Sequence, residues 1–243
     1  METIYFEDSH GRKLCGVISN RDSQSAVLMC HGLGSHKDDM PYLTLQDKIN
    51  DSGVATFRMD LLGHGGSEGD FNDLTLSEAI DDILCAKHEL ERRGYSRVGF
   101  IGSSFGGVGG IMVASKEDFH FLVLISPPTH YDVNEMIKSG IYILRELKIV
   151  NKITQKKKAR PNIKFFRDYG SHDSYIAAKK ISSPVLIIQG DKDKIVPLVK
   201  TKELHNIIRG SKIKIFKGAN HQYTHAQGRL VKEIMLFVKK QKK

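Results

Sequence analysis

The pentapeptide Gly102-Ser103-Ser104-Phe105-Gly106 constrains this chain more than any other segment. The short apolar run 97–101 before it is typical of a strand, and the small apolar run 107–115 after it suits a buried helix. A serine on so tight a strand-to-helix turn is expected to be strained and exposed, and side chains at the flanking glycines would clash. The helix would also point backbone N–H groups toward negative charge that develops at the serine. The pattern therefore predicts a nucleophile at Ser104.

The same glycines admit two other interpretations. One is a plain glycine-rich turn, and the other is the phosphate-binding loop of a dinucleotide-binding fold. The second predicts an early βαβ unit and an acidic residue at the end of the next strand, about 20 residues on. Here the loop lies in the middle of the chain, and the next strand-like run, 121–125, ends in Ser126-Pro127-Pro128. The rest of the chain must therefore decide between a nucleophile turn and these two alternatives.

Strand-like and helix-like patterns alternate along most of the 243 residues. Strands are expected at 2–7, 13–19, 26–30, 54–59, 97–101, 121–125, 184–189 and 212–216, and helices at 38–51, 75–93, 107–115, 198–209 and 227–239. The first two strands should form an antiparallel hairpin. The alternation predicts an α/β fold, with a mostly parallel sheet of about eight strands and helices on both faces.

Residues 128–180 break this alternation. They contain helical patterns at 133–149 and 174–180 and a lysine-rich connection at 156–160. We expect a core formed by 1–127 and 181–243, with 128–180 as a cap inserted after the sixth strand. Residues 138–180 hold 12 Lys or Arg and 3 acidic residues, whereas the rest of the chain holds 25 of each. The net charge of +9 therefore belongs to this insertion, either as a solvated surface or as a patch that attracts anionic substrates.

Composition excludes several classes of protein. The chain is 40% hydrophobic and 27% charged, which is typical of a globular protein with a proper core. The sequence has no secretory-leader pattern and no apolar run of membrane-spanning length. Cys15, Cys30 and Cys85 are odd in number and widely spaced, so we expect free thiols and a cytoplasmic location.

A serine hydroxyl needs a general base and an acid that orients the base. In a parallel α/β sheet, functional groups gather at the carboxyl ends of the strands. Asp191 and Asp193 follow the run 184–189, and His221 follows the run 212–216. Serine, aspartate and histidine therefore occur in the chain order that suits such a sheet.

With these motifs the chain resembles the α/β-hydrolase superfamily over nearly its whole length apart from 128–180. The segments that carry the resemblance are His31-Gly32-Leu33-Gly34, RMDLLGHGGS at 58–67, the Ser104 pentapeptide, GDKDKIVP at 190–197 and GANH at 218–221. Within the superfamily it looks most like small hydrolases of the cinnamoyl and feruloyl esterase, monoacylglycerol lipase and serine aminopeptidase types. Haloalkane dehalogenases and epoxide hydrolases carry an aspartate where this chain has Ser104, which argues against both.

The resemblance implies roles for individual residues. Asp193 would be the acid, with Asp191 as the alternative, and His221 would be the base. The backbone N–H groups of Leu33 and Phe105 would form the oxyanion hole.

Three further histidines are expected to lie outside the chemistry. His31 and His64 should brace their loops. His225 could share a helix face with His221, but no acidic or cysteine partner stands at ligand spacing. We therefore expect no metal and no cofactor.

The expected activity is hydrolysis of carboxylic esters through an acyl-enzyme. The same residues would serve an acyl thioester or a small peptide or amide, and a non-catalytic binding protein of this fold is the remote alternative. The partner would be a small-molecule ester, for which an anionic or an aromatic group is an option, and a homodimer stays open. Nucleic acid is not expected, because the basic segment lacks interleaved aromatic residues.

Overall fold

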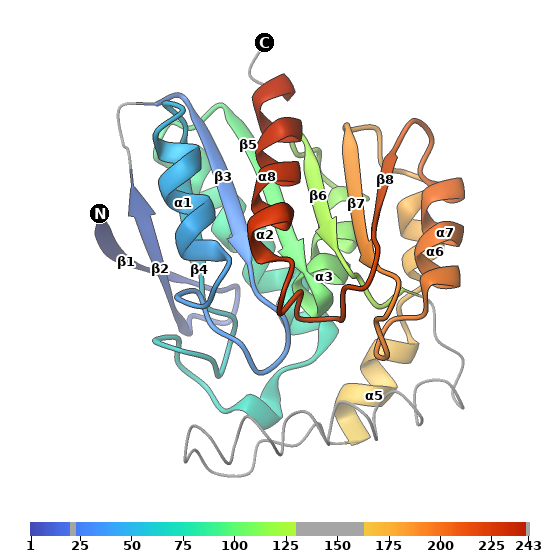
Figure 1. Ribbon diagram of the computed structural model, residues 1–243. Coiled ribbons are helices and arrows are strands. Elements are labelled where there is room, and N and C mark those ends of the chain that lie inside the picture. The colour runs from blue at the N-terminus through green and yellow to red at the C-terminus, as the bar shows by residue number, and fades with distance from the viewer. Residues whose placement is uncertain (20–22, 130–162, 242–243) are drawn as a thin grey trace.

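A computed structural model describes residues 1–19, 23–129 and 163–241, which include an eight-stranded sheet (Figure 1). The strands are β1 (Glu2–Glu7), β2 (Lys13–Ser19), β3 (Ser25–Cys30), β4 (Ala55–Met59), β5 (Arg97–Ser103), β6 (Leu122–Ile125), β7 (Val185–Gly190) and β8 (Lys212–Phe216). They lie in the order β1-β2-β4-β3-β5-β6-β7-β8. β1 and β2 form an antiparallel hairpin, β2 runs antiparallel to β4, and the other pairs are parallel. The mostly parallel sheet predicted from the sequence is confirmed.

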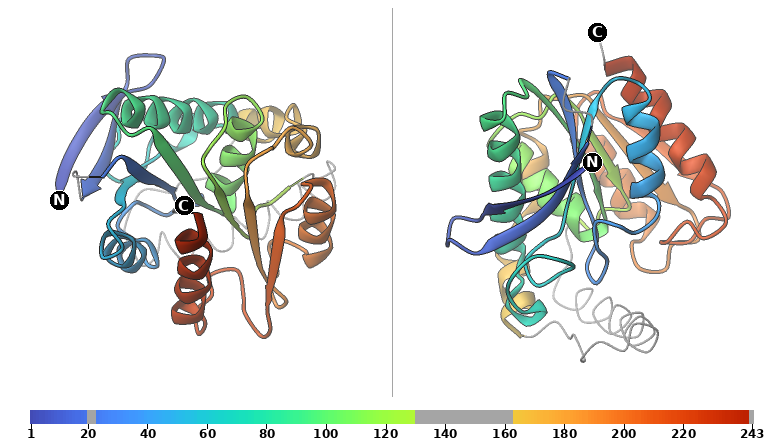
Figure 2. Two further views of the ribbon diagram at one scale, coloured as in Figure 1. Left: turned by 90° about the horizontal axis from the view of Figure 1, so that it is seen from above. Right: turned by 90° about the vertical axis from the view of Figure 1, so that its left-hand side faces the viewer.

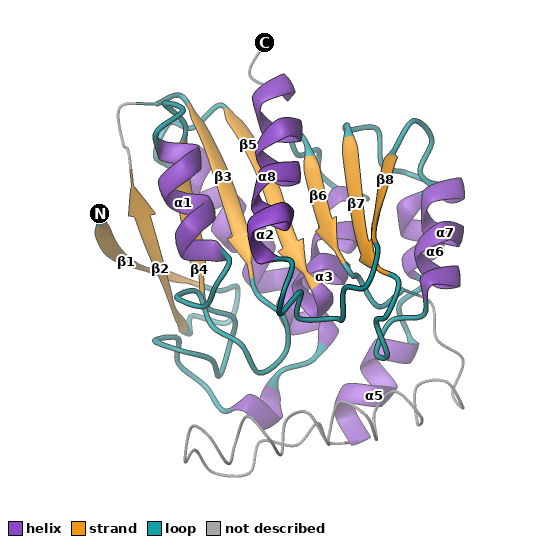
Figure 3. Cartoon of the chain, in the orientation of Figure 1, coloured by secondary structure: helices purple, strands orange, loops and turns teal. Residues whose placement is uncertain are grey.

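Helices cover both faces of the sheet (Figures 2 and 3). α1 (Tyr42–Asn50) and α8 (Gln227–Val238) lie on one side, and α2 (Leu76–Arg92) and α3 (Ser104–Ala114) lie on the other. The other helices in the described part of the chain are α5 (Ile163–Gly170), α6 (Ser174–Ala178), α7 (Leu198–Ile207) and the short 3-10 turns η1 (Phe71–Asp73) and η2 (Lys239–Gln241). Among the residues that the structure describes, no helix combines the length and apolar character that crossing a bilayer requires.

The central strands show why this arrangement is stable. In β3, Leu28 and Cys30 join the hydrophobic cluster on the side of α2 and α3, whereas Val27 and Met29 join the cluster on the side of α1 and α8. Successive side chains of a strand point to opposite faces, so a strand covered on both faces must be apolar throughout. The continuous apolar runs in the sequence follow from this two-sided burial.

Helix ends follow local chemistry. Thr75 caps α2, because its hydroxyl accepts a hydrogen bond from the Glu78 N–H at 3.2 Å. α1 begins at Tyr42 rather than near residue 38, so the predicted start was wrong. Pro41 precedes the helix, and a proline inside a helix would lack its N–H and clash with the preceding turn.

The predicted insertion, residues 128–180, is only partly described. The helical pattern predicted at 133–149 and the lysine-rich 156–160 lie outside the described residues. α6 lies within the pattern predicted at 174–180, whereas the sequence did not predict α5. α5 lies at the end of the sheet where the parallel strands terminate (Figure 1).

The loops after β3, β4 and β5 begin side by side. Cys30 is the register partner of both Met59 and Gly102, so these three strands end at the same level. β7 and β8 run parallel to them and terminate at the same edge of the sheet. Residues far apart in sequence therefore gather at this carboxyl edge.

Asp82 on α2 gives a pH-dependent stability. Its side chain is fully buried, its Oδ2 accepts the Leu62 N–H at 2.8 Å, and its Oδ1 has no hydrogen-bond partner among the described residues. Burial raises the pKa of Asp82 to about 8. Above the ordinary pKa of an aspartate, the unfolded chain has released this proton, whereas the folded protein keeps it until the pH approaches 8. The free energy of unfolding therefore falls as the pH rises toward 8.

Asp82→Asn keeps an acceptor for Leu62 and cannot ionise. We expect the variant to gain at least ~1 kcal/mol in unfolding free energy relative to the wild type between pH 5 and pH 9. Urea denaturation at several pH values measures this. The control is Asp51→Asn, at an exposed position, whose unfolding free energy should depend on pH as that of the wild type does. If the unfolding free energy of Asp82→Asn also depends on pH as that of the wild type does, the raised pKa of Asp82 is contradicted.

Candidate active site

Ser104 stands at the junction of β5 and α3 with φ of 48°, a left-handed value that is costly for a residue with a side chain. The two glycines that flank the turn are required because a side chain has no room at either position. A Cβ on Gly106 would lie 2.4 Å from the carbonyl oxygen of His31, and one on Gly102 would lie 2.8 Å from the oxygen of Gly106. The tight turn and its glycines are therefore as the sequence predicts.

His221 reaches Ser104 from the loop after β8. Its Nε2 lies 3.0 Å from the Ser104 Oγ, so a neutral imidazole can accept the hydroxyl proton. Tyr223, two residues on, is buried with φ of 53°, and its hydroxyl lies 2.9 Å from the Ser126 Oγ. This contact joins the histidine loop to the end of β6.

Asp193 lies on the other side of the imidazole. The His221 Nδ1–H donates to Asp193 Oδ2 at 2.8 Å, and the N–H groups of Ile195 and Val196 donate to Oδ1 at 2.8 and 2.9 Å. Burial alone would raise the pKa of Asp193, but the hydrogen bond from His221, the positive charge of that ring when it is protonated, and these two backbone bonds outweigh burial and lower the pKa. The carboxylate therefore stays ionised and holds His221 with Nε2 facing Ser104.

Asp191 lies elsewhere in the same turn. It accepts the Gly218 N–H at 2.6 Å, which ties the turn after β7 to the turn after β8. Of the two candidate aspartates, Asp193 is the one that the structure brings to His221. His225 is exposed and belongs to neither cluster of metal-ligating side chains among the described residues.

Gln189 and Thr201, which the sequence did not predict as part of the site, support Asp193. The Gln189 side-chain amide donates to Asp193 Oδ2 at 2.8 Å and to the Val196 carbonyl at 3.1 Å. The Thr201 hydroxyl donates to the Gln189 Oε1 at 2.8 Å, which fixes that amide. The sequence did carry one signal for this contact, because Gln189 is a polar residue at the end of the otherwise apolar run of β7.

Of the two amides predicted for the oxyanion hole, that of Phe105 directly follows Ser104 in the chain. α3 begins at Ser104, so the Phe105 N–H is among the first four of the helix, which have no partner within it. A Cβ on Gly32 would lie 3.1 Å from the Ser104 Cβ, so the segment that carries Leu33 approaches the serine closely.

The described part of the insertion also reaches this turn. The ring of Phe165 on α5 packs against the ring of Phe105 with centroids 5.5 Å apart. Asp168 on α5 accepts hydrogen bonds from the Ser77 N–H at 2.9 Å and from the Ser77 hydroxyl at 2.6 Å. α5 is therefore held between α2 and the residue that follows Ser104.

Comparisons with known proteins agree with this architecture. Residues 21–175 match the family described as serine aminopeptidase, S33. The chain is 26% identical over 211 residues to the human protein ABHD12B, covering 84% of this chain and 56% of that protein. The chain thus spans about half the length of this curated relative.

Two solved structures share the fold. Est1E from Butyrivibrio proteoclasticus with bound ferulic acid has a TM-score of 0.79 and 23% identity, and 98% of each chain is covered. The Pyrococcus furiosus esterase Pf2001 has a TM-score of 0.78 and 17% identity, with 98% of this chain and 90% of that chain covered. With the matched family, the eight-stranded sheet and the Ser104 turn, these findings show that the chain belongs to the serine aminopeptidase S33 family of the α/β-hydrolase superfamily.

Proposed function

We propose that this protein is a serine hydrolase that cleaves carboxylic esters through an acyl-enzyme. The observation that carries the proposal is the chain of contacts from Ser104 Oγ to His221 Nε2 at 3.0 Å and from His221 Nδ1 to Asp193 Oδ2 at 2.8 Å. A strained serine, a neutral imidazole and an ionised carboxylate in this order are the parts that acyl transfer needs.

The reaction has two halves. His221 takes the Ser104 proton while the Oγ attacks the ester carbonyl, and the tetrahedral intermediate collapses as protonated His221 gives its proton to the leaving alcohol. Water then attacks the acyl-enzyme as His221 takes a proton from it, and protonated His221 gives that proton to the Ser104 Oγ as the acid leaves. Asp193 keeps the imidazole in the right tautomer and stabilises its charge.

The oxyanion of each intermediate would be bound by the Leu33 and Phe105 N–H groups. Removing one such donor in comparable enzymes costs about 10²–10³ in kcat. The lack of a Phe105 partner within α3 and the close approach of Gly32 to Ser104 support this assignment.

Residues 128–180 would form a cap that selects the substrate. Support comes from α5, because Phe165 packs on Phe105 and Asp168 binds Ser77. The charge of this insertion favours esters with a negative group, and the aromatic side chains of α5 favour an aromatic acyl group. The ferulic acid in the Est1E structure makes hydroxycinnamate esters a sensible member of any substrate panel.

Ser104→Ala tests the nucleophile. We expect the fold to be kept and hydrolysis of p-nitrophenyl esters to fall by ~10⁴-fold or more, because no other group can form the acyl-enzyme. Fluorophosphonate labelling followed by mass spectrometry should modify Ser104 in the wild type. Ester hydrolysis that survives the substitution would refute the proposal, and a panel that also contains an acyl thioester and an amide tests the alternative substrates.

Asp193→Asn and Asp191→Asn form a matched pair. Asp193→Asn should lower kcat by ~10³-fold or more, because the amide no longer holds the tautomer of His221 that accepts the serine proton. Asp191→Asn should cost less than ~10-fold, since Asp191 binds only the backbone of the turn. Steady-state kinetics on both variants measures this, and the reverse order would move the acid role to Asp191.

Salt dependence tests the cap. For a neutral and an anionic ester with the same acyl group, kcat/KM for the anionic ester should fall more steeply as salt rises to ~0.5 M. Changing Lys156, Lys157 and Lys158 together to Gln should reduce this difference. An equal response of both esters would mean that the basic residues are only a solvated surface.

A further inference from the structure

The segment that carries the Leu33 amide has its internal side-chain hydrogen bonds mainly beyond Gly34, where the Ser35 hydroxyl and the His36 N–H donate to Asp39 Oδ2 at 2.6 and 3.1 Å. Residues 31–39 leave β3 at the carboxyl edge without forming a helix or strand. The Ser35 N–H donates to the Gly32 carbonyl at 3.2 Å, and Gly34 adopts φ of 75°. Glycine has more accessible backbone conformations than other residues, so the stretch 32–34 gains from contacts that other loops make with it.

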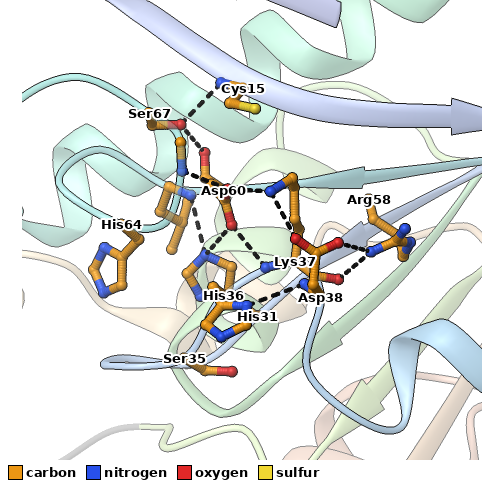
Figure 4. A network of polar contacts seen from close by, with 12 residues as sticks. Cys15, His31, Ser35, His36, Lys37, Asp38, Arg58, Asp60, His64 and Ser67 are labelled. Atoms are coloured by element: carbon orange, nitrogen blue, oxygen red, sulfur yellow. Dashed lines mark hydrogen bonds and ion pairs between the residues drawn. The ribbon is translucent and has the colours of Figure 1, made fainter. Parts of the chain in front are cut away.

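Two histidines bind this segment to the loop after β4, and Figure 4 shows the positions of His31 and His64 relative to Asp60. The Leu61 N–H donates to His31 Nε2 at 3.1 Å, and the Gly34 N–H donates to His64 Nε2 at 3.1 Å. The bond to Gly34 holds the residue directly after Leu33, while Gly32 on its other side lies against Ser104. The Leu33 peptide is thus fixed from both ends.

Both rings are held as the same neutral tautomer. Nδ1–H of His31 donates to the Gly32 carbonyl at 2.8 Å, and Nδ1–H of His64 donates to the Leu62 carbonyl at 2.9 Å. Nε2 of each ring must then accept, which is the role the two N–H groups require. Burial lowers the pKa of His31, which favours this neutral form.

Asp60 supplies a third connection between the two loops. Its fully buried carboxylate accepts the Lys37 N–H at 2.7 Å through Oδ1, and the Gly66 N–H at 2.9 Å through Oδ2. The Lys37 ammonium lies 3.0 Å from Oδ2. A Cβ on Gly65 would lie 2.1 Å from Oδ2, so the loop wraps closely around the carboxylate. Residues on both sides of the Leu33 peptide are therefore bound to one rigid loop.

We propose that the loop 60–67 is the template for the oxyanion hole and that His64 is a positioning residue for the Leu33 amide. The proposal rests on the serine hydrolase function proposed above. His64 does not touch the substrate, and its bond to Gly34 keeps the neighbouring N–H directed at the site where the oxyanion forms. Because this charge is greatest in the transition state, loss of the bond should lower kcat and leave KM nearly unchanged.

The experiment compares His64→Ala, His64→Gln and the control His88→Ala, which removes an exposed histidine of α2. Each variant is assayed for kcat and KM with a p-nitrophenyl ester and for inhibition by a trifluoromethyl ketone, whose adduct with the serine places an oxyanion in the hole. His64→Ala should lose about 10- to 100-fold in kcat, and the inhibitor should weaken by the factor lost in kcat/KM. His64→Gln should recover much of the loss, since its Oε1 reaches about the position of Nε2, and His88→Ala should match the wild type.

A folded His64→Ala protein with wild-type kcat, or with lower kcat and unchanged inhibitor affinity, would overturn the proposal. Where circular dichroism shows that His64→Ala does not fold, His64→Asn decides, because its oxygen reaches the position of Nδ1 and cannot accept from Gly34. Full activity in His64→Asn would also overturn the proposal.

Ser104→Ala is run in parallel to separate two kinds of failure. Hydrolysis by the wild type that does not depend on Ser104 refutes the serine hydrolase function. Hydrolysis that depends on Ser104 but keeps its kcat in the His64 variants refutes only the positioning role.

Discussion

The close contact between Gly106 and the end of β3 is the constraint on which the site depends. A Cβ at Gly106 would lie 2.4 Å from the His31 carbonyl, so the first turn of α3 can approach the β3 backbone only without a side chain there. This approach accompanies the positive φ of Ser104 and brings the loop that begins at His31 against the serine. One backbone contact thus positions both the half-buried Ser104 and the loop that begins at His31.

Around this contact, buried polar side chains are bonded mainly to backbone N–H groups. Asp193 binds the N–H groups of Ile195 and Val196, and Asp60 binds those of Lys37 and Gly66. Burying a charge is costly unless such bonds compensate it, and a compensated carboxylate fixes the loops that donate to it. The loops at the carboxyl edge are therefore ordered by these buried charges as much as by apolar packing.

The sequence predicted the strands and the serine turn well because both follow from short-range patterns. The apolar run of β7 and the glycines at 102 and 106 carry their information within a few residues. The contacts of Gln189 with Asp193 and of His64 with Gly34 join separate loops, so no local pattern reveals them. The choice between Asp191 and Asp193 likewise needed the turn geometry, and α5 was missed because its eight residues lie in an irregular basic stretch.

The geometry suggests a physical division between rate and selectivity. The loops after β3 and β5 carry the amides that would meet a charge formed only in the transition state, so changes there act on kcat. The charge of residues 138–180 would attract an anionic substrate before and during the reaction alike, which is uniform binding and would act on KM and the association rate. Phe165 on α5 is where the two regions meet, because it belongs to the insertion and packs on Phe105. Substitution of Phe165 would therefore change kcat and KM together. Substitutions farther along either region would change one of the two and leave the other.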